Sequence, residues 1–284
     1  MQKVAIVTDS IACLPKEFIE QYGIEVIPIN LYFGDKLYRD GVHITASEAY
    51  ELFLEDPESF KTSAPSPVEC LEAFRRVSER AKDILCVTVS AKLSMVYNSA
   101  LEAKELAEQE LPQATIEVID SQTATPAEGF VALAAARAAA EDKSLTEVVG
   151  TAAEIRNKIN AFILLDTIRH VYRSGRIPKI ASQVGSILNI RPVLTVSGVV
   201  HFAGAVRNRE QGINRILRTM RDKVGQKPAH ISVMHAYALD EAEKLMKQVA
   251  NEFNCVELWL SEFSPVMGYA CGTGTLGLAF YNDE

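Results

Sequence analysis

The sequence predicts an α/β protein with a parallel sheet in its N-terminal part and a second α/β domain in its C-terminal part. Apolar runs of strand length alternate with segments of helical periodicity, and this alternation is typical of a parallel sheet covered by helices on both faces. Three predicted helix starts also carry the capping-box spacing, in which a hydroxyl residue precedes a glutamate by three positions: Thr45 and Glu48, Ser66 and Glu69, Ser144 and Glu147.

Taken in order, the predicted strands of the N-terminal part cover residues 4–7, 24–29, 84–89 and 115–119. The pattern changes after Asn160, where a strand over residues 161–165, a basic stretch, a hairpin across Ser197 and Gly198 and a last strand over residues 278–281 are expected. We therefore predict two domains, 1–160 and 161–284, and because no low-complexity linker separates them we expect a packed interface. A cleft at such an interface is a natural ligand site.

Composition excludes several classes of function. The formal charge of −8 and the pI near 5.3 argue against general attraction to nucleic acid or to an anionic membrane surface. The N-terminal residues do not resemble a signal peptide, and no apolar run approaches the length of a membrane span. The five cysteines are scattered without a CxxC pair, which predicts a reducing cytoplasm and no structural metal.

The most informative segment is residues 86–100, where an apolar run stops at Ser90 and a helical pattern begins near Ser94. Hydroxyls and free backbone N–H groups are thereby placed at the carboxyl end of a predicted strand, a position that favours binding of an anionic small molecule. Two further strands end in an Asp-Ser pair, at Ser10 and at Ser121, so polar groups gather at one sheet edge. Each of these serines is also an ordinary turn or cap residue when considered alone.

Other candidate binding residues come from loops and basic segments. Thr62 and Ser63 lie in a predicted loop, residues 61–67, whose two prolines either fix these hydroxyls as donors or simply make a rigid connector. Arg176, after a glycine, and Arg207 lie in two basic stretches suited to an anionic ligand or a phosphate-bearing partner.

The glycines at 272, 274 and 277 match the GxGxxG spacing, but too few residues follow for a dinucleotide-binding unit. Neither a Walker motif nor a GxSxG serine elbow is present in the sequence. The pattern around Gly272 instead indicates a backbone that approaches another group closely.

Taken together, seven segments resemble the DegV family of bacterial fatty-acid-binding proteins. They occur in the family order and spread over the chain: residues 8–15, 61–67, 90–100, 118–121, 174–177, 185–194 and 272–277. The resemblance implies two α/β domains with an acyl chain, such as palmitate or oleate, buried between them and no other cofactor. It also implies a cytoplasmic subunit, without turnover of its own, of a two-component fatty-acid kinase in phospholipid metabolism. The partner that the resemblance implies is a catalytic subunit resembling dihydroxyacetone kinase, with only transient membrane contact.

When the family's binding roles are carried over to the matching positions, the resemblance implies that Thr62 and a serine of the segment from Ser90 to Ser94 hold the fatty-acid carboxylate. It assigns Arg176 to the family's glycine-arginine motif and Arg207 to a position associated with phosphate transfer. Ser63, Tyr269 and Gly272 complete the expected ligand-binding set.

The chain departs from the family pattern at three places. Ala91 replaces a second adjacent serine, Met95 and Val96 replace a glycine and a threonine, and Ala270 occupies the place of a histidine before the terminal glycine-rich turn. The missing imidazole removes one hydrogen-bond partner of the carboxylate, for which Tyr269 offers a substitute hydroxyl. The alternative function is a stand-alone hydrolase or transferase acting on a small acyl or phosphorylated substrate, and a nucleic-acid-binding regulator ranks last.

Overall fold

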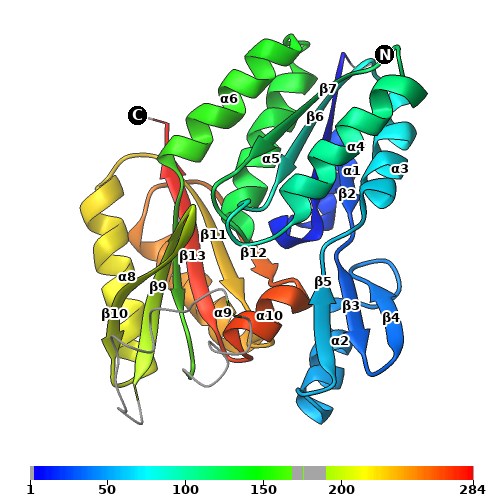
Figure 1. Cartoon of the computed structure of the whole chain (residues 1–284). Coiled ribbons are helices and arrows are strands. Elements are labelled where there is room, and N and C mark those ends of the chain that lie inside the picture. Colours follow the sequence, from blue (N-terminus) through cyan, green and yellow to red (C-terminus); the bar gives the residue numbers. More distant parts are fainter. Residues whose placement is uncertain (1–2, 168–174, 176–189, 284) are drawn as a thin grey trace.

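The computed structural model describes residues 3–167, 175 and 190–283, and their strands form three sheets (Figure 1). The first sheet is entirely parallel, with the strand order β2 (Glu25–Ile27), β1 (Val4–Asp9), β6 (Asp83–Thr88) and β7 (Thr115–Asp120). The second sheet is mixed and has the order β10 (Val199–Val206), β9 (Arg191–Ser197), β8 (Asn160–Leu164), β13 (Leu276–Asn282), β11 (Ala229–His235) and β12 (Cys255–Glu262). The predicted α/β class and its parallel N-terminal sheet are confirmed.

A third, antiparallel sheet was not predicted from the sequence. Its strand order is β4 (Lys36–Arg39), β3 (Asn30–Phe33) and β5 (Phe60–Ser63). The predicted strand over residues 24–29 is present but too long, because β2 ends at Ile27 and the chain then passes through Pro28 into β3 of the other sheet. A proline has no N–H to donate to a sheet ladder and so favours such a break. The small sheet and helix α2 (Ala46–Glu55) extend below the first sheet in Figure 1.

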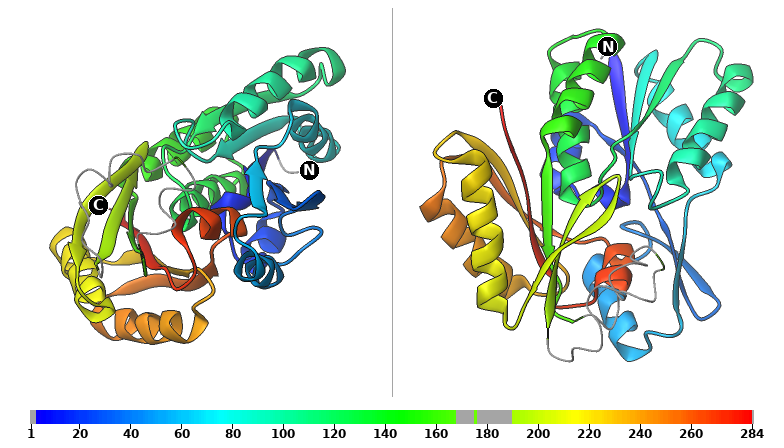
Figure 2. Two further views of the ribbon diagram at one scale, coloured as in Figure 1. Left: turned by 60° about the horizontal axis from the view of Figure 1, so that its bottom comes forward. Right: turned by 60° about the vertical axis from the view of Figure 1, so that its left-hand side comes forward.

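The helices form layers on and between the two larger sheets. Helices α3 (Pro67–Ser78) and α4 (Val96–Glu110) cover one face of the first sheet, whereas α8 (Arg209–Val224) and α9 (Leu239–Glu252) cover the outer face of the second. Between the two sheets lie α5 (Pro126–Ala140) and α6 (Leu145–Lys158), which contact strands of both (Figure 2). The remaining helical segments are η1 (Ser10–Ala12), α1 (Lys16–Tyr22) and α10 (Pro265–Cys271).

Local sequence signals account for several element ends. All three predicted capping boxes are present, at the first residues of α2, α3 and α6. The predicted hairpin is also confirmed, since β9 and β10 pair across Gly198, whose φ is +69°. Helix α4 begins at Val96, close to the predicted start near Ser94, and has no side-chain cap, so Ser94 lies between the turn that follows β6 and the helix.

Helix α5 is the shared core of the two halves of the molecule. It is buried around nearly its whole circumference and packs in the largest apolar cluster with residues of both sheets. Close packing against η1 depends on Gly129, because a Cβ at this position would lie 2.6 Å from the carbonyl oxygen of Ala12. None of the helices in the described part of the chain is long and apolar enough to cross a membrane.

Candidate functional site

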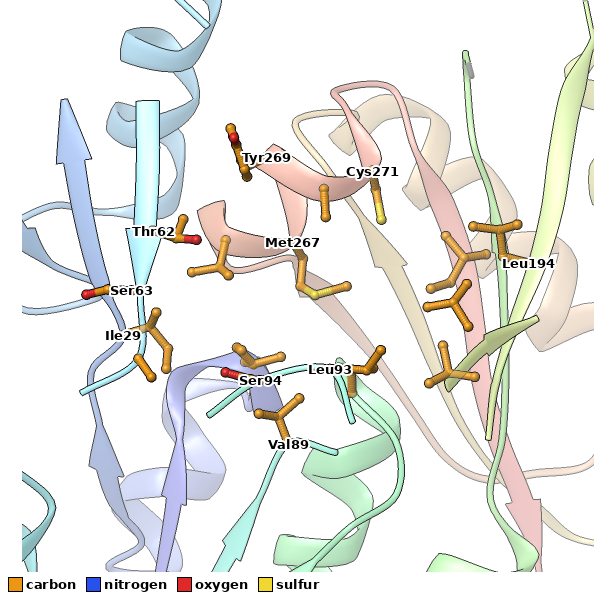
Figure 3. Close-up of a pocket in the computed structure, with 18 residues that line it drawn as sticks. Ile29, Thr62, Ser63, Val89, Leu93, Ser94, Leu194, Met267, Tyr269 and Cys271 are labelled. Atoms are coloured by element: carbon orange, nitrogen blue, oxygen red, sulfur yellow. The ribbon is translucent and has the colours of Figure 1, made fainter. Parts of the chain in front are cut away.

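An apolar cavity lies between the carboxyl ends of the first sheet, β5, α10 and the inner face of the second sheet (Figure 3). The volume open to the centre of a water molecule is about 90 Å³. Figure 3 shows Thr62, Ser94 and Tyr269 toward one end and Leu194 of β9 toward the other. Ile163, Val196 and Val200 also line the cavity, from β9 and the strands paired with it. Leu93 and Met267 lie between the two ends. The cavity therefore has hydroxyl groups at one end and aliphatic side chains along the rest.

Thr62 and Ser63 are neighbours on β5, and the prediction that they lie in a loop is wrong. Thr62 pairs with Leu31 and Ser63 pairs with Asn30 of β3. Both residues line the cavity. Successive side chains of a strand point to opposite faces, and Figure 3 shows the Thr62 hydroxyl directed toward the cavity and the Ser63 hydroxyl directed away from it. The ladder thus fixes the direction of the Thr62 side chain more firmly than a proline-restricted loop would.

The two serines that follow β6 occupy different environments. Ser94 lies at the cavity, and its hydroxyl has no hydrogen-bond partner among the described residues. Ser90 is fully buried outside the lining, and its Oγ donates to the carbonyl oxygen of Gly198 at 2.5 Å. The structure therefore leaves Ser94 available to a ligand and uses Ser90 to hold the β9–β10 turn.

Helix α10 supplies one wall of the cavity. Tyr269 stacks on Phe60 with ring centroids 5.9 Å apart and contacts Phe53 edge-on at 6.4 Å, so its ring is held at the hydroxyl end. Ala270 lines the cavity, at the position where the family resemblance implied a histidine. Gly272 ends α10 with φ +83° and donates its N–H to the Gly268 carbonyl at 2.7 Å, but it is not among the lining residues.

The two predicted arginines are not brought to the cavity by the described structure. Arg176 lies outside the described residues. Arg207 is exposed and borders a separate surface groove between β10 and α8, together with Arg215 and Arg218. The segment that carries Arg207 is held by the hydrogen bond from its backbone N–H to Gln211 Oε1 at 3.2 Å.

A buried acidic network lies next to the cavity and was only partly predicted. Asp9 and Ser10 were expected at the sheet edge, and Ser10 Oγ donates to Asp40 Oδ2 at 2.7 Å. Ser264 donates to the same oxygen from the C-terminal half. Burial raises the pKa of Asp40, while these two hydroxyl donors oppose the rise. Asp40 thus joins the small sheet to both halves of the molecule.

Glu128 is the member of this network that sequence reasoning missed. It is fully buried in the first turn of α5, beside Asp9. A signal for it was present, because Glu128 is the only charged residue in an otherwise apolar helical run that extends to Arg137. A lone acid in a helix that is apolar on all faces must be buried with a partner. Within the described chain, no group of three or more metal-ligating side chains was found.

Comparison with known proteins decides the family. The profile of the DegV family matches residues 3–283. This chain belongs to the DegV family. A DegV domain-containing protein from Clostridium acetobutylicum is 30% identical over 285 residues and covers 99% of each chain. A second one, from Caldanaerobacter subterraneus, is 35% identical over 223 residues, or 78% of each chain.

Solved structures of DegV proteins share the fold over the full length. The structure of a DegV family protein from Thermus thermophilus, described with fatty acid binding, has a TM-score of 0.89 at 29% identity and covers 99% of each chain. DegV of Bacillus subtilis, described as a fatty acid binding protein, has a TM-score of 0.89 at 26% identity and covers 100% of each. A stearic-acid-binding protein from Eubacterium ventriosum has a TM-score of 0.86 at 26% identity and covers 98% of each.

Proposed function

We propose that this DegV-family chain binds a long-chain fatty acid, such as palmitate or oleate, in the apolar cavity. The carboxylate lies at the hydroxyl end and the tail runs toward the second sheet. The observation that carries this proposal is the polarity of one cavity, with Thr62 and Ser94 toward one end and Leu194 toward the other. Ile163 and Val196, on the paired strands β8 and β9, add further aliphatic lining. Fatty acid binding by the similar proteins of Thermus thermophilus and Bacillus subtilis supports it.

The two parts of the ligand have different roles in binding. Burial of apolar carbon contributes roughly 0.8 kcal/mol per methylene, so a tail of about 15 methylenes contributes on the order of 12 kcal/mol before ordering costs. The tail therefore supplies most of the affinity. A buried carboxylate without partners would cost several kcal/mol, and the hydroxyls of Thr62 and Ser94 offset this cost and fix which end of the molecule lies at β5.

We also propose that the bound acid is presented to a separate kinase subunit and that this chain has no turnover of its own. The described lining contains hydroxyls but no histidine or carboxylate to act as a general base, which favours binding over hydrolysis. The sequence has no Walker motif, which favours phosphoryl transfer by another chain. We place the docking surface on the side of Arg207, where three arginines border one groove.

The test is direct measurement of lipid binding. Native mass spectrometry of the purified protein should detect bound fatty acid, and delipidated protein should bind added palmitate or oleate. Thr62→Val removes one donor at nearly constant volume and should weaken palmitate binding by about 10-fold, because a hydrogen bond to a charged group contributes about 1.5–3 kcal/mol. Binding of hexadecane, which has no carboxylate, should not change.

Ser63→Ala is the matched control, because Ser63 is the next residue on β5 and its hydroxyl points away from the cavity. We expect palmitate affinity within about 2-fold of wild type for this variant, since no head-group contact is lost. Wild-type protein that neither carries nor accepts palmitate or oleate would refute the function. Equal losses of palmitate and hexadecane in Thr62→Val would refute the placement of the carboxylate.

A further inference from the structure

Two buried carboxyl groups, those of Asp9 on β1 and Glu128 on α5, lie directly behind the cavity wall. Asp9 is 1% exposed and Glu128 is 0% exposed, and the two side chains are close enough to share a hydrogen bond if one of them is protonated. Two carboxylates repel each other, and burial makes the repulsion stronger. A hydrogen bond between them therefore requires that one of the two carries a proton.

The contacts of Asp9 identify it as the acceptor. Its Oδ1 accepts from the backbone N–H of Ile11 at 3.0 Å, and its Oδ2 accepts from the backbone N–H of Val89 at 2.9 Å. Both oxygens are thus occupied by donors, as expected for an ionised carboxylate. Ile11 and Val89 both line the cavity, so this one side chain joins two separate segments of the cavity wall.

The contacts of Glu128 identify it as the proton carrier. Its Oε1 accepts from the Thr8 hydroxyl at 3.5 Å, whereas its Oε2 is buried and receives no donor from the described residues. An ionised oxygen in this position would have lost its hydration without any replacement. A protonated Oε2 instead becomes a donor, and the acceptor within reach is Asp9.

The surroundings supply no compensating positive charge. Other titratable groups that interact with the pair are the carboxyl groups of Asp40 and Asp120 and the thiols of Cys13, Cys70 and Cys86. No lysine or arginine is among the main influences on the pKa of Asp9 or Glu128 in the described part of the chain. A second negative charge at this place would therefore remain unbalanced, which favours the singly protonated pair.

We propose that Glu128 is a positioning residue of the lipid site: its protonated carboxyl group donates to Asp9, and Asp9 holds the backbone of Ile11 and Val89 in the cavity wall. The segment after Val89 continues to Leu93 and Ser94, so the position of a head-group hydroxyl depends on the same contact. The effect on lipid affinity rests on the proposed function, whereas the effect on the two backbone segments does not.

The experiment compares two variants of Glu128 with wild type. Glu128→Gln keeps a donor for Asp9 at every pH, and Glu128→Leu has a similar volume but no donor. Val131→Ala, also in α5 and buried away from the cavity lining, is the control for general destabilisation. The readouts are the amide hydrogen-exchange rates of Ile11 and Val89 in lipid-free protein and the dissociation constant for palmitate between pH 6.5 and 9.

We expect Glu128→Leu to speed exchange at Ile11 and Val89 at least 10-fold and to weaken palmitate binding at least 10-fold. Glu128→Gln should restore both toward wild type and should lose less affinity than wild type as the pH rises. Val131→Ala should leave the difference in exchange rate between these two amides and the amides of β1 and β6 unchanged.

Unaltered exchange and affinity in Glu128→Leu would overturn the proposal, as would a Glu128→Gln variant as impaired as the leucine variant. If Glu128→Leu does not fold, the pH series decides, and coincident profiles for wild type and Glu128→Gln would overturn it. Because exchange is measured without lipid, a chain that binds no palmitate still tests the positioning role.

Discussion

Ser90 and Gly198 are 108 positions apart in the sequence, yet the Ser90 hydroxyl donates to the Gly198 carbonyl at 2.5 Å. The backbone N–H of Gly198 also donates to the carbonyl of Gln122 at 2.5 Å. These two bonds attach the β9–β10 turn to the loops that follow β6 and β7. The strands that carry Val196 and Val200 are thereby fixed against the N-terminal half, which closes the far end of the cavity.

Ser90→Ala and Ser94→Ala should separate structural from ligand-binding hydroxyls. Loss of the Ser90 hydroxyl leaves the Gly198 carbonyl without this donor and should lower the free energy of unfolding by about 1–2 kcal/mol, with little change in palmitate affinity. Ser94→Ala should change the free energy of unfolding little but weaken palmitate binding about 10-fold. Urea unfolding and palmitate titration measure the two effects. A greater loss of affinity in Ser90→Ala than in Ser94→Ala would contradict this division.

Ala270→His should strengthen binding of the acid. Ala270 lines the cavity on α10, so an imidazole introduced there adds a hydrogen-bond donor for the carboxylate. A hydrogen bond to a charged group contributes about 1.5–3 kcal/mol, and we expect an increase in palmitate affinity of about 10-fold below pH 7. Ala270→Leu adds bulk without a donor and is the control. Equal affinity changes in the two variants would show that the imidazole acts only by its volume.

The sequence predicted those features of the site that depend on contacts between residues close together in the chain, but not those that depend on contacts between distant residues. Capping boxes and the turn at Gly198 are local, and their geometry was predicted correctly. The partner strand of Thr62 is not local, because its paired residue, Leu31 of β3, lies 31 positions earlier. Their pairing creates a sheet that no run of apolar residues indicated. For this reason the hydroxyl residues of the cavity were found, whereas the face to which each points was not.

The same limit applies to the choice between Ser90 and Ser94. Both follow β6 and both are serines in a turn, and only the distant Gly198 distinguishes them. Arg207 is a further example. Its basic segment was evident from the sequence, but its position in the groove between β10 and α8 depends on how these two elements pack. The local sequence pattern therefore predicted which residues are candidates for the site and roughly where in the fold they lie. The direction of each side chain depends on tertiary contacts that the pattern does not show.

Glu257→Gln should weaken the junction between α5 and the second sheet. Arg137 donates to both oxygens of Glu257 at 2.9 and 2.6 Å, and His230 contacts Glu257 at 2.5 Å. Burial by itself raises the pKa of Glu257, but the hydrogen bonds from Arg137 and His230 outweigh it and lower the pKa to about 2. A lowered carboxyl pKa stabilises the fold above pH 4.5, and this contribution is lost as the pH falls toward 2.

We expect Glu257→Gln to reduce the free energy of unfolding by about 2 kcal/mol at pH 7, between the values for exposed and buried ion pairs. The difference from wild type should shrink as the pH falls below 4.5. Glu252→Gln is the matched control, because Glu252 pairs with the half-exposed Arg221 and should cost less than about 1 kcal/mol. Chemical denaturation at a series of pH values measures both, and equal costs at pH 7 would contradict the expectation.

Glu128→Gln should make the protein more resistant to alkaline conditions. Burial, followed by the neighbouring charge of Asp9, holds the pKa of Glu128 well above 4.5, and burial raises the pKa of Asp9 to about 6. The folded state therefore binds more protons than the unfolded chain, so its stability falls as the pH rises from 4.5 through the raised pKa of Glu128. Glutamine does not titrate, so the variant does not lose the folding stability that wild type loses when Glu128 gives up its proton.

The stability of Glu128→Gln relative to wild type should thus increase between pH 5 and 9, by at most about 1.4 kcal/mol for each pH unit. Urea unfolding midpoints at pH 5, 7 and 9 measure the trend. Glu147→Gln is the control, because the hydrogen bonds from Ser144 lower the pKa of this exposed capping residue. Its proton is lost in both states above pH 6, so its difference from wild type should stay constant there. If the stability of Glu128→Gln relative to wild type were also constant, Glu128 would be ionised in the folded protein. Asp9 would then need a hydrogen-bond donor other than Glu128.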